Sequence, residues 1–224
     1  MKQTPAHEVA NADLLALIPP AVARVVEPGC SAGALAREYR ARYPACDYVG
    51  IEVEPRYAEL ARRHCSRVLV SDLERMSDAD LDVLAPADAW VFGDVLEHLV
   101  DPWRLLARIR PRLAPGGCVV ACIPNMQHWS VLARLASGRL FYEDKGLLDR
   151  THLRWFTRTT IVPLFENAGF RVTLLNGRVF EAPNAAAAIA AVRALSVALG
   201  VERARAIEDT GVLQWLVRAE PGAG

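Results

Sequence analysis

Short apolar runs alternate along the chain with segments in which apolar residues recur at helical spacing. The apolar runs predict strands at about 22–27, 48–51, 68–70, 89–92, 118–123, 170–175 and 214–219. The helical spacing predicts helices at about 33–43, 55–65, 102–113, 157–168 and 184–200, and a short helix after Asn11 that ends at Pro19. Regular alternation of strand and helix is typical of a parallel sheet with helices on both faces. The sequence therefore predicts an α/β, doubly wound, Rossmann-like fold.

The alternation breaks at 124–156, between the predicted strand 118–123 and the helix that Thr157 begins. A connection of this length in a compact domain is usually functional or disordered, and its aromatic content argues against disorder. We predict a lid over an acceptor pocket, with a helix at 130–137 and with Trp129 and Tyr142 as substrate contacts. No linker or internal repeat is visible, so residues 1–224 are expected to form a single domain.

Composition narrows the class of partner. Of the 224 residues 52% are hydrophobic, and the formal net charge is +0, so no global positive field attracts nucleic acid or an anionic membrane surface. We expect a small-molecule partner, and monomer and homodimer both remain open. The five scattered cysteines predict free thiols in a bacterial cytoplasm. The apolar run 185–192 is too short to span a bilayer, and no signal peptide is evident.

The stretch 23–33 reads A-R-V-V-E-P-G-C-S-A-G and predicts a strand, a tight turn and the start of a helix. The turn residues are small, which lets the backbone approach a ligand closely. Glu27 ends the strand, and a carboxylate at a helix N-terminus suits a cationic amino acid better than a pyrophosphate. The predicted cofactor contacts here are Glu27, Gly29, Cys30, Ser31 and Gly33.

The motif E-P-G-C-S-A-G resembles the first motif of class I S-adenosylmethionine (SAM)-dependent methyltransferases, with Ser31 in place of the middle glycine. A second likeness is D-V-L-E-H-L at 94–99. A third is L-L-D-R-T-H-L-R-W-F-T at 147–157, which is similar to a stretch of a bacterial small-molecule subgroup. The resemblance implies SAM as cofactor, S-adenosylhomocysteine as product, a mostly parallel seven-stranded sheet and an antiparallel last strand.

Two acids beyond the turn are candidates for the adenosine end of the cofactor. Glu52 ends the strand 48–51 about twenty residues after the turn, where such folds place an acid for the ribose hydroxyls, and Val53 would touch the ribose or adenine. The alternative for Glu52 is a helix cap before Pro55. The resemblance implies that Asp72 binds the adenine amino group and that Leu73 packs on the ring, while a helix N-cap is the alternative for Asp72.

The resemblance also places 93–95 (Gly93, Asp94 and Val95) across the methionine end of the cofactor, facing the acceptor. Methyl transfer to a hydroxyl needs positioning and removal of one proton, which a histidine can accept near neutral pH. His98, His128 and His152 lie at the carboxyl edge of the predicted sheet, where ligands bind in open α/β sheets. Structural roles remain open: His98 bonded to Asp101 or to backbone, and His152 pinning the lid through Asp149 or Thr151.

We therefore expect an enzyme that transfers the methyl group of SAM to a small molecule, most simply to a hydroxyl, with nitrogen or carbon as alternative acceptors. A binding protein without turnover and a NAD(P)-dependent oxidoreductase are the competing classes, and Glu27 opposes the second. Asn125 orients the acceptor or caps the lid helix, and Arg150 and Arg154 hold an acceptor anion or are exposed helix charges. No metal site is predicted, because near 118–123 only Asn125 offers an oxygen ligand.

Overall fold

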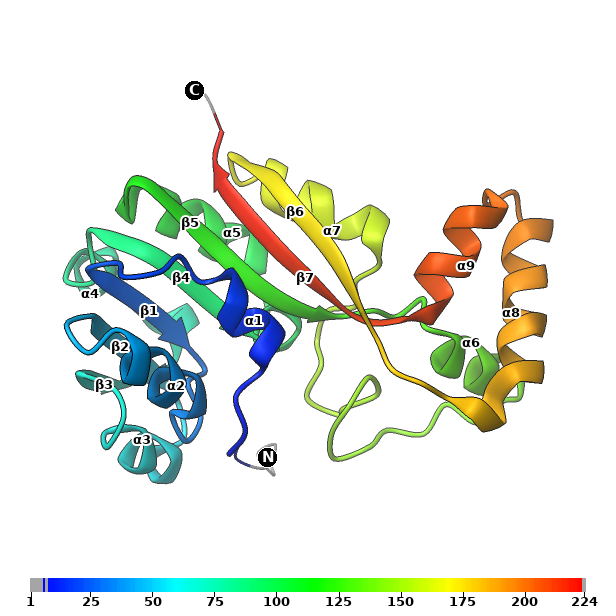
Figure 1. The fold of residues 1–224 in the computed structure, drawn as a ribbon, viewed down its shortest axis with the longest axis horizontal. Coiled ribbons are helices and arrows are strands. Elements are labelled where there is room, and N and C mark those ends of the chain that lie inside the picture. The colour runs from blue at the N-terminus through cyan, green and yellow to red at the C-terminus, as the bar shows by residue number, and fades with distance from the viewer. Residues whose placement is uncertain (1–5, 7, 223–224) are drawn as a thin grey trace.

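A seven-stranded sheet with the order β3-β2-β1-β4-β5-β7-β6 forms the centre of the protein (Figure 1). The computed structural model describes residue 6 and residues 8–222, apart from the side chain of Asn184. β7 runs antiparallel to β5 and β6, whereas the remaining neighbours pair in parallel. The strands are Arg24–Pro28 (β1), Asp47–Glu52 (β2), Arg67–Val70 (β3), Ala87–Gly93 (β4), Leu113–Pro124 (β5), Phe170–Val179 (β6) and Val212–Pro221 (β7). The predicted fold class is confirmed.

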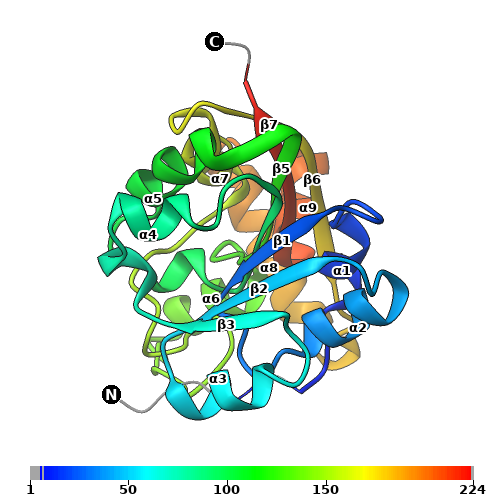
Figure 2. The same cartoon turned by 90° about the vertical axis from the view of Figure 1, so that its left-hand side faces the viewer.

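Helices cover both faces of the sheet because neighbouring strand residues point to opposite sides. Val25 belongs to the same core cluster as residues of α1 (Ala12–Leu17) and α2 (Ala34–Arg42), whereas Val26 belongs to the cluster that contains residues of α4 (Asp78–Asp82), α5 (Pro102–Ile109) and α7 (Arg158–Glu166). Figure 2 shows these two helical layers on either side of the strands. The α-helices are Ala12–Leu17 (α1), Ala34–Arg42 (α2), Pro55–Ala61 (α3), Asp78–Asp82 (α4), Pro102–Ile109 (α5), Trp129–Ala136 (α6), Arg158–Glu166 (α7), Ala186–Ala198 (α8) and Arg203–Gly211 (α9). The short 3-10 helices are Leu73–Arg75 (η1), Leu96–His98 (η2), Arg110–Arg112 (η3) and Pro183–Ala185 (η4).

Several boundaries differ from the prediction. The sequence missed α4 and α9, and β6 and β7 are longer than predicted. Residues 114–117, between the predicted helix 102–113 and the predicted strand 118–123, lie inside β5 as a bulge. Leu113 pairs with Ala87 and Cys118 with Ala89, so residues 114–117 stand opposite Asp88 alone. Gly116 allows this bulge with a φ of +78°.

A group of three helices, α6, α8 and α9, lies beyond the ends of β5, β6 and β7 (Figure 1). α6 and α9 both pack against α8. α6 belongs to the predicted lid, whereas α8 and α9 connect β6 to β7, so segments far apart in the chain build this end of the molecule together. The helix predicted at 130–137 is confirmed as α6, and its role as part of a lid stays a prediction.

Two bulk expectations can be compared with the structure. All five cysteines are buried free thiols. Within the described part of the chain, no helix combines the length and apolar character that crossing a membrane requires.

Candidate active site

The turn between β1 and α2 has the backbone shape that its small residues predicted. Gly29 has a φ of +65°, and a Cβ there would lie 2.6 Å from Cγ2 of Val95. Gly33 has a φ of +79°, and its Cβ would lie 3.0 Å from Cα of Ala61. Ser31 adopts a φ of +49°, which non-glycine residues rarely take, and its N–H donates to Oε2 of Glu52 at 2.8 Å. The turn is therefore held tightly between β2, α3 and the segment after β4.

Glu27 is a buried carboxyl group beside this turn, with 6% of its surface exposed. The Tyr48 hydroxyl donates to its Oε2 at 2.9 Å. Burial raises the pKa of Glu27 well above its usual value, and the negative charges of Cys65 and Glu52 add to the rise. A cationic ligand group next to Glu27 would stabilise its carboxylate form.

A cleft with a cavity volume of about 60 Å³ opens beside Glu27. The turn lines one side, Gly93 and Asp94 line another, and Asn11 before α1 and Leu14 within it close the cleft. Asn11 also caps α1 by accepting the Leu14 N–H at 3.1 Å. The lining thus joins residues from α1, the first turn and the end of β4.

Glu52 ends β2 and is 5% exposed. Its Oε1 accepts the Glu54 N–H at 2.9 Å, and Oε2 accepts from Ser31. Each oxygen keeps a second lone pair, so these bonds leave capacity for a diol. The cap of α3 is Glu54, not Glu52, so the helix-cap alternative for Glu52 is wrong. Val53 beside it is 53% exposed, an apolar surface at the strand end.

Asp72 follows β3 and caps η1 by accepting the Glu74 N–H at 3.1 Å. It also pairs with Arg75 at 3.2 Å. This is the N-cap alternative that the sequence left open, and the adenine role stays a prediction. Leu73 is buried in the core on the α4–α5 side of the sheet, with 7% of its surface exposed.

The segment after β4 crosses the front of the turn. Asp94 has a φ of +55° and accepts a hydrogen bond from the Gln214 side chain. Val95 supplies the methyl group that faces Gly29. This segment therefore touches the cofactor turn on one side and leads directly into η2 on the other.

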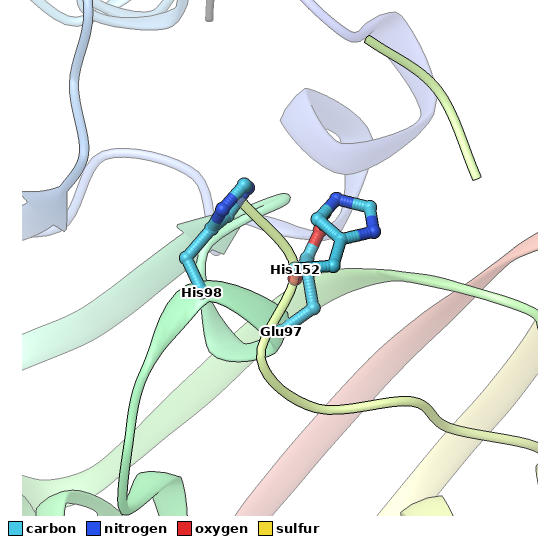
Figure 3. A group of neighbouring side chains, drawn as sticks. All are labelled: Glu97, His98 and His152. Carbon is cyan, nitrogen blue, oxygen red and sulfur yellow. Dashed lines mark ion pairs between the residues drawn. The ribbon is translucent and has the colours of Figure 1, made fainter. Parts of the chain in front are cut away.

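Three ligand-type side chains meet at η2, as Figure 3 shows. Glu97 and His98 belong to η2, and His152 comes from the loop between α6 and α7. Nε2 of His152 lies 3.9 Å from Oε1 of Glu97, and the two imidazole rings are 4.7 Å apart at 74°. The Leu153 and Arg154 N–H groups donate to the Glu97 backbone carbonyl at 2.8 and 2.9 Å, which fixes this loop against η2.

The sequence predicted the two histidines of this group and missed Glu97. Its carboxyl group is 1% exposed, and burial together with the charges of Asp94 and Asp149 raises its pKa well above the usual value. Burial, together with the neighbouring His98, lowers the pKa of His152 to about 4. The sequence feature that could have identified Glu97 as a site residue is its position next to His98 in D-V-L-E-H-L, after a buried strand.

The hydrogen bonds of the two histidines bear on the structural alternatives. Nδ1 of His98 contacts the Thr151 carbonyl at 3.2 Å and the Thr151 hydroxyl at 3.0 Å, so it bonds backbone as one alternative stated. Asp101 instead caps α5. Nδ1 of His152 contacts the Leu147 carbonyl at 3.3 Å, and its backbone N–H donates to the Asp149 carbonyl at 3.1 Å. A structural role for His152 through Asp149 therefore stays open.

Two other candidates have structural roles. His128 caps α6, with its Nδ1 2.8 Å from the Ser130 hydroxyl, and burial lowers its pKa to about 4. Asn125 is fully buried, and its amide donates to the carbonyls of Asp209 at 2.7 Å and Val212 at 2.8 Å. Asn125 therefore ties the end of β5 to the start of β7, a role that neither sequence alternative included.

The remaining substrate candidates lie on the loop or on α6. Trp129 begins α6 and packs on His128, whereas Tyr142 is 67% exposed. Arg150 pairs with Asp144 at 2.8 Å, and Arg154 stacks over Trp103 at 5.8 Å. Neither arginine lies on a helix, so that part of the alternative is wrong. A cavity of about 180 Å³ lies under this loop, lined by Ser130, Val131, Arg134, Glu143, Leu147, Leu148 and Leu213.

Comparison with known proteins identifies the family. A methyltransferase domain model matches residues 5–175. The chain belongs to this methyltransferase family. Trans-aconitate 2-methyltransferase of Methylobacterium nodulans is 36% identical over 115 residues, which cover 51% of this chain and 43% of that protein. The ubiquinone biosynthesis O-methyltransferase of Cereibacter sphaeroides is 29% identical over 173 residues, covering 75% of this chain and 68% of that protein. The chain thus spans less than half of the first relative.

A solved structure shows the same fold. The S-adenosylmethionine-dependent methyltransferase of Mesorhizobium loti superposes with a TM-score of 0.59 at 16% identity, covering 93% of this chain and 95% of that chain. Human N-acetylserotonin methyltransferase, solved in complex with SAM, also has this fold: its TM-score is 0.52 at 21% identity, covering 89% of this chain and 48% of that chain. The residues fit this cofactor: the buried Glu27 faces a cleft whose turn glycines admit no side chain, and Glu52 keeps acceptor capacity for a ribose.

Proposed function

We propose that this methyltransferase methylates a hydroxyl group of a small molecule bound under the loop between α6 and α7. The observation that carries the proposal is the group Glu97, His98 and His152, whose first member follows Asp94 of the cleft beside Glu27 by three residues in the chain. Methyl transfer from a sulfonium is an in-line displacement, and a hydroxyl acceptor must also lose a proton. Polar side chains that can take a proton thus lie next to the cofactor segment.

We place SAM in the cleft beside Glu27 and extend it along the carboxyl ends of β1, β2 and β3. Glu27 and Asp94 would face the methionine end, with Gly29, Cys30, Ser31, Gly33, Gly93 and Val95 forming the walls. Glu52 would accept the ribose hydroxyls, and Val53, Asp72 and Leu73 would border the adenine. The exposed apolar surface of Val53 beside the buried Glu52 supports this order, because adenosine has one apolar ring and one diol.

The acceptor half uses the cavity under the loop. Leu147 lines that cavity and its carbonyl contacts His152, so an acceptor in the cavity would lie beside the imidazole pair. In the absence of a metal ion, His98 or His152 would take the hydroxyl proton. Trp129, Tyr142, Arg150 and Arg154 lie on the same elements and would adjust the shape and charge of the acceptor pocket.

The names of the relatives support a small acceptor. One is a trans-aconitate 2-methyltransferase and another an O-methyltransferase of ubiquinone biosynthesis. The described residues also include two arginines, Arg150 and Arg154, on the loop, which would suit an acceptor that carries an anionic group.

The test is transfer of a labelled methyl group from SAM to a panel of phenols, aliphatic alcohols, carboxylic acids and amines. We expect products methylated on a hydroxyl oxygen, identified by mass spectrometry. Products methylated only on nitrogen, carbon or carboxylate would contradict the hydroxyl assignment. His152→Ala should lower kcat while leaving the Kd of SAM unchanged, and His64→Ala, a histidine after α3, is the matched control.

A further inference from the structure

The group Glu97, His98 and His152 contains a buried carboxyl group without a matching partner. Neither Glu97 oxygen has a hydrogen-bond partner among the residues that the structure describes, apart from an interaction with its own backbone N–H. The charges of Asp94 and Asp149, which raise its pKa, are also negative. A buried carboxylate in such surroundings is stable only with a proton or a cation.

Both imidazoles are oriented by contacts of their Nδ1 atoms. His98 donates from Nδ1 to Thr151, and the Thr151 hydroxyl donates in turn to Oδ1 of the buried Asp149 at 2.7 Å. His152 donates from Nδ1 to the Leu147 carbonyl. These contacts place the lone pair of each ring on Nε2. A histidine held by a carbonyl or by a chain ending in a carboxylate is typical of metal sites in proteins.

The spacing of the three groups suits one ion. Their ligand atoms all lie within 4.8 Å of one another, and Glu97 and His152 approach to 3.9 Å. Metal–ligand distances near 2.1 Å in a tetrahedral site separate two ligands by about 3.4 Å. Small side-chain rotations would close the difference. Two imidazoles with one carboxylate form a ligand set that Zn²⁺ and other divalent transition metals accept.

We propose that Glu97, His98 and His152 bind a divalent transition-metal ion, with Zn²⁺ the best match, and that the acceptor hydroxyl occupies an open position on it. The role of the ion rests on the hydroxyl methylation proposed above. Coordination lowers the pKa of the hydroxyl, and its proton leaves to water before transfer. The oxygen lone pair then forms the new O–C bond as the S–C bond breaks, and the electron pair stays on the sulfur of S-adenosylhomocysteine. The two histidines hold the ion and do not take the proton.

The site revises the sequence prediction of no metal. That prediction rested on the residues near the strand 118–123. The three ligands instead come from the turn after β4 and from a loop more than fifty residues later, so no sequence spacing joins them.

The test is metal binding by the full chain after treatment with EDTA and removal of the chelator. Titration with Zn²⁺ in a calorimeter should show one tight site per chain. Glu97→Gln, which keeps the size of the side chain, and His152→Ala should each weaken this site at least about 100-fold. Thr151→Val, which removes the hydroxyl partner of His98 and keeps the carbonyl, should weaken it about tenfold. His64→Ala should bind like the wild type. Near-ultraviolet circular dichroism checks that each variant is folded.

Absence of a stoichiometric site in the wild type, or equal affinity in folded Glu97→Gln and His152→Ala, would overturn the metal site. Two outcomes distinguish failure of the metal proposal from failure of the proposed hydroxyl methylation. EDTA-treated protein that methylates hydroxyls at the wild-type rate removes the ion from the reaction and leaves the acceptor class intact. If the protein binds Zn²⁺ tightly but transfers methyl groups only to nitrogen or carbon, the metal site is supported and the hydroxyl acceptor is contradicted.

Discussion

Glu27→Gln isolates the charge of the acid at the end of β1. Glutamine has nearly the same size and can still accept the Tyr48 hydroxyl, which lies 2.9 Å from Oε2. The substitution therefore removes the negative charge and little else. If Glu27 faces the cationic methionine end of SAM, its loss should weaken cofactor binding without disturbing the turn.

The magnitude follows from burial. Glu27 is 6% exposed, so a charge-assisted hydrogen bond there is poorly screened and contributes about 1.5 to 3 kcal/mol. At 1.4 kcal/mol for each factor of ten, the Kd of SAM should rise about 10- to 150-fold. Surface charges contribute far less, so Glu38→Gln on α2, whose side chain is 42% exposed, should leave the Kd unchanged.

Glu27→Gln, which should weaken SAM binding, should stabilise the folded protein when no cofactor is bound. Burial raises the folded-state pKa of Glu27 above its unfolded value of about 4.3. The folded state therefore binds the proton more tightly, and the stability from this group is lost as pH rises from the unfolded pKa through the folded one. Glu27→Gln cannot ionise, so it should unfold at higher urea than the wild type at pH 8 and show less difference at pH 4.

Calorimetry in two buffers of different ionisation enthalpy provides a second readout. SAM binding should release a proton from Glu27 in the wild type, because a cation beside the carboxyl group favours its charged form. Glu27→Gln should release none. A variant that binds SAM as tightly as the wild type would refute the electrostatic role of Glu27, and an unchanged proton release would refute the linkage.

Three further substitutions test other parts of the structure. Glu52→Ala should weaken SAM binding at least tenfold, about 1.4 kcal/mol, in a calorimetric titration, and an unchanged Kd would remove the ribose role. Gly29→Ala should lower the free energy of unfolding by about 2 to 4 kcal/mol, because it strains a positive φ and drives a methyl group into Val95. Val95→Ala in the same chain should restore part of this loss, and strictly additive effects would contradict the contact. Asn125→Ala should cost about 2 to 5 kcal/mol in urea unfolding, because two buried carbonyls lose their donor, and a loss below 1 kcal/mol would contradict its tie to β7.

The cofactor half of the site was predictable because it is local in the chain. A buried strand, a turn of small residues and an acid about twenty residues later fix the positions of Glu27 and Glu52 through geometry that spans few residues. The same rules predicted the sheet, since apolar runs and helical spacing decide its elements. They missed α9, whose sequence R-A-R-A-I-E-D-T-G has no continuous apolar stripe and which is held by packing on α8.

The acceptor half was only partly predictable because its contacts join distant segments. The bonds of Asn125 reach residues 84 and 87 positions later, and the chain pattern contains no sign of them. Glu97 lies in a 3-10 turn, where neither helical nor strand periodicity decides which way a side chain points. Sequence reasoning therefore found the histidines as residue types with suitable chemistry and could not find the carboxyl group that they meet.

The cofactor turn and the acceptor side of the site also differ in the backbone hydrogen bonds that hold them in place. The turn that would bind the cofactor is held by short-range backbone bonds, such as those from Gly29 and Cys30 to the Ile51 carbonyl at 2.7 and 3.3 Å. His152 reaches Glu97 only because the backbone of the next two residues bonds to the Glu97 carbonyl. Displacement of this loop would carry His152 away and leave Glu97 and His98 in place on η2. Changes that loosen the loop should thus lower turnover and metal affinity together, while SAM affinity, set by the turn, stays the same.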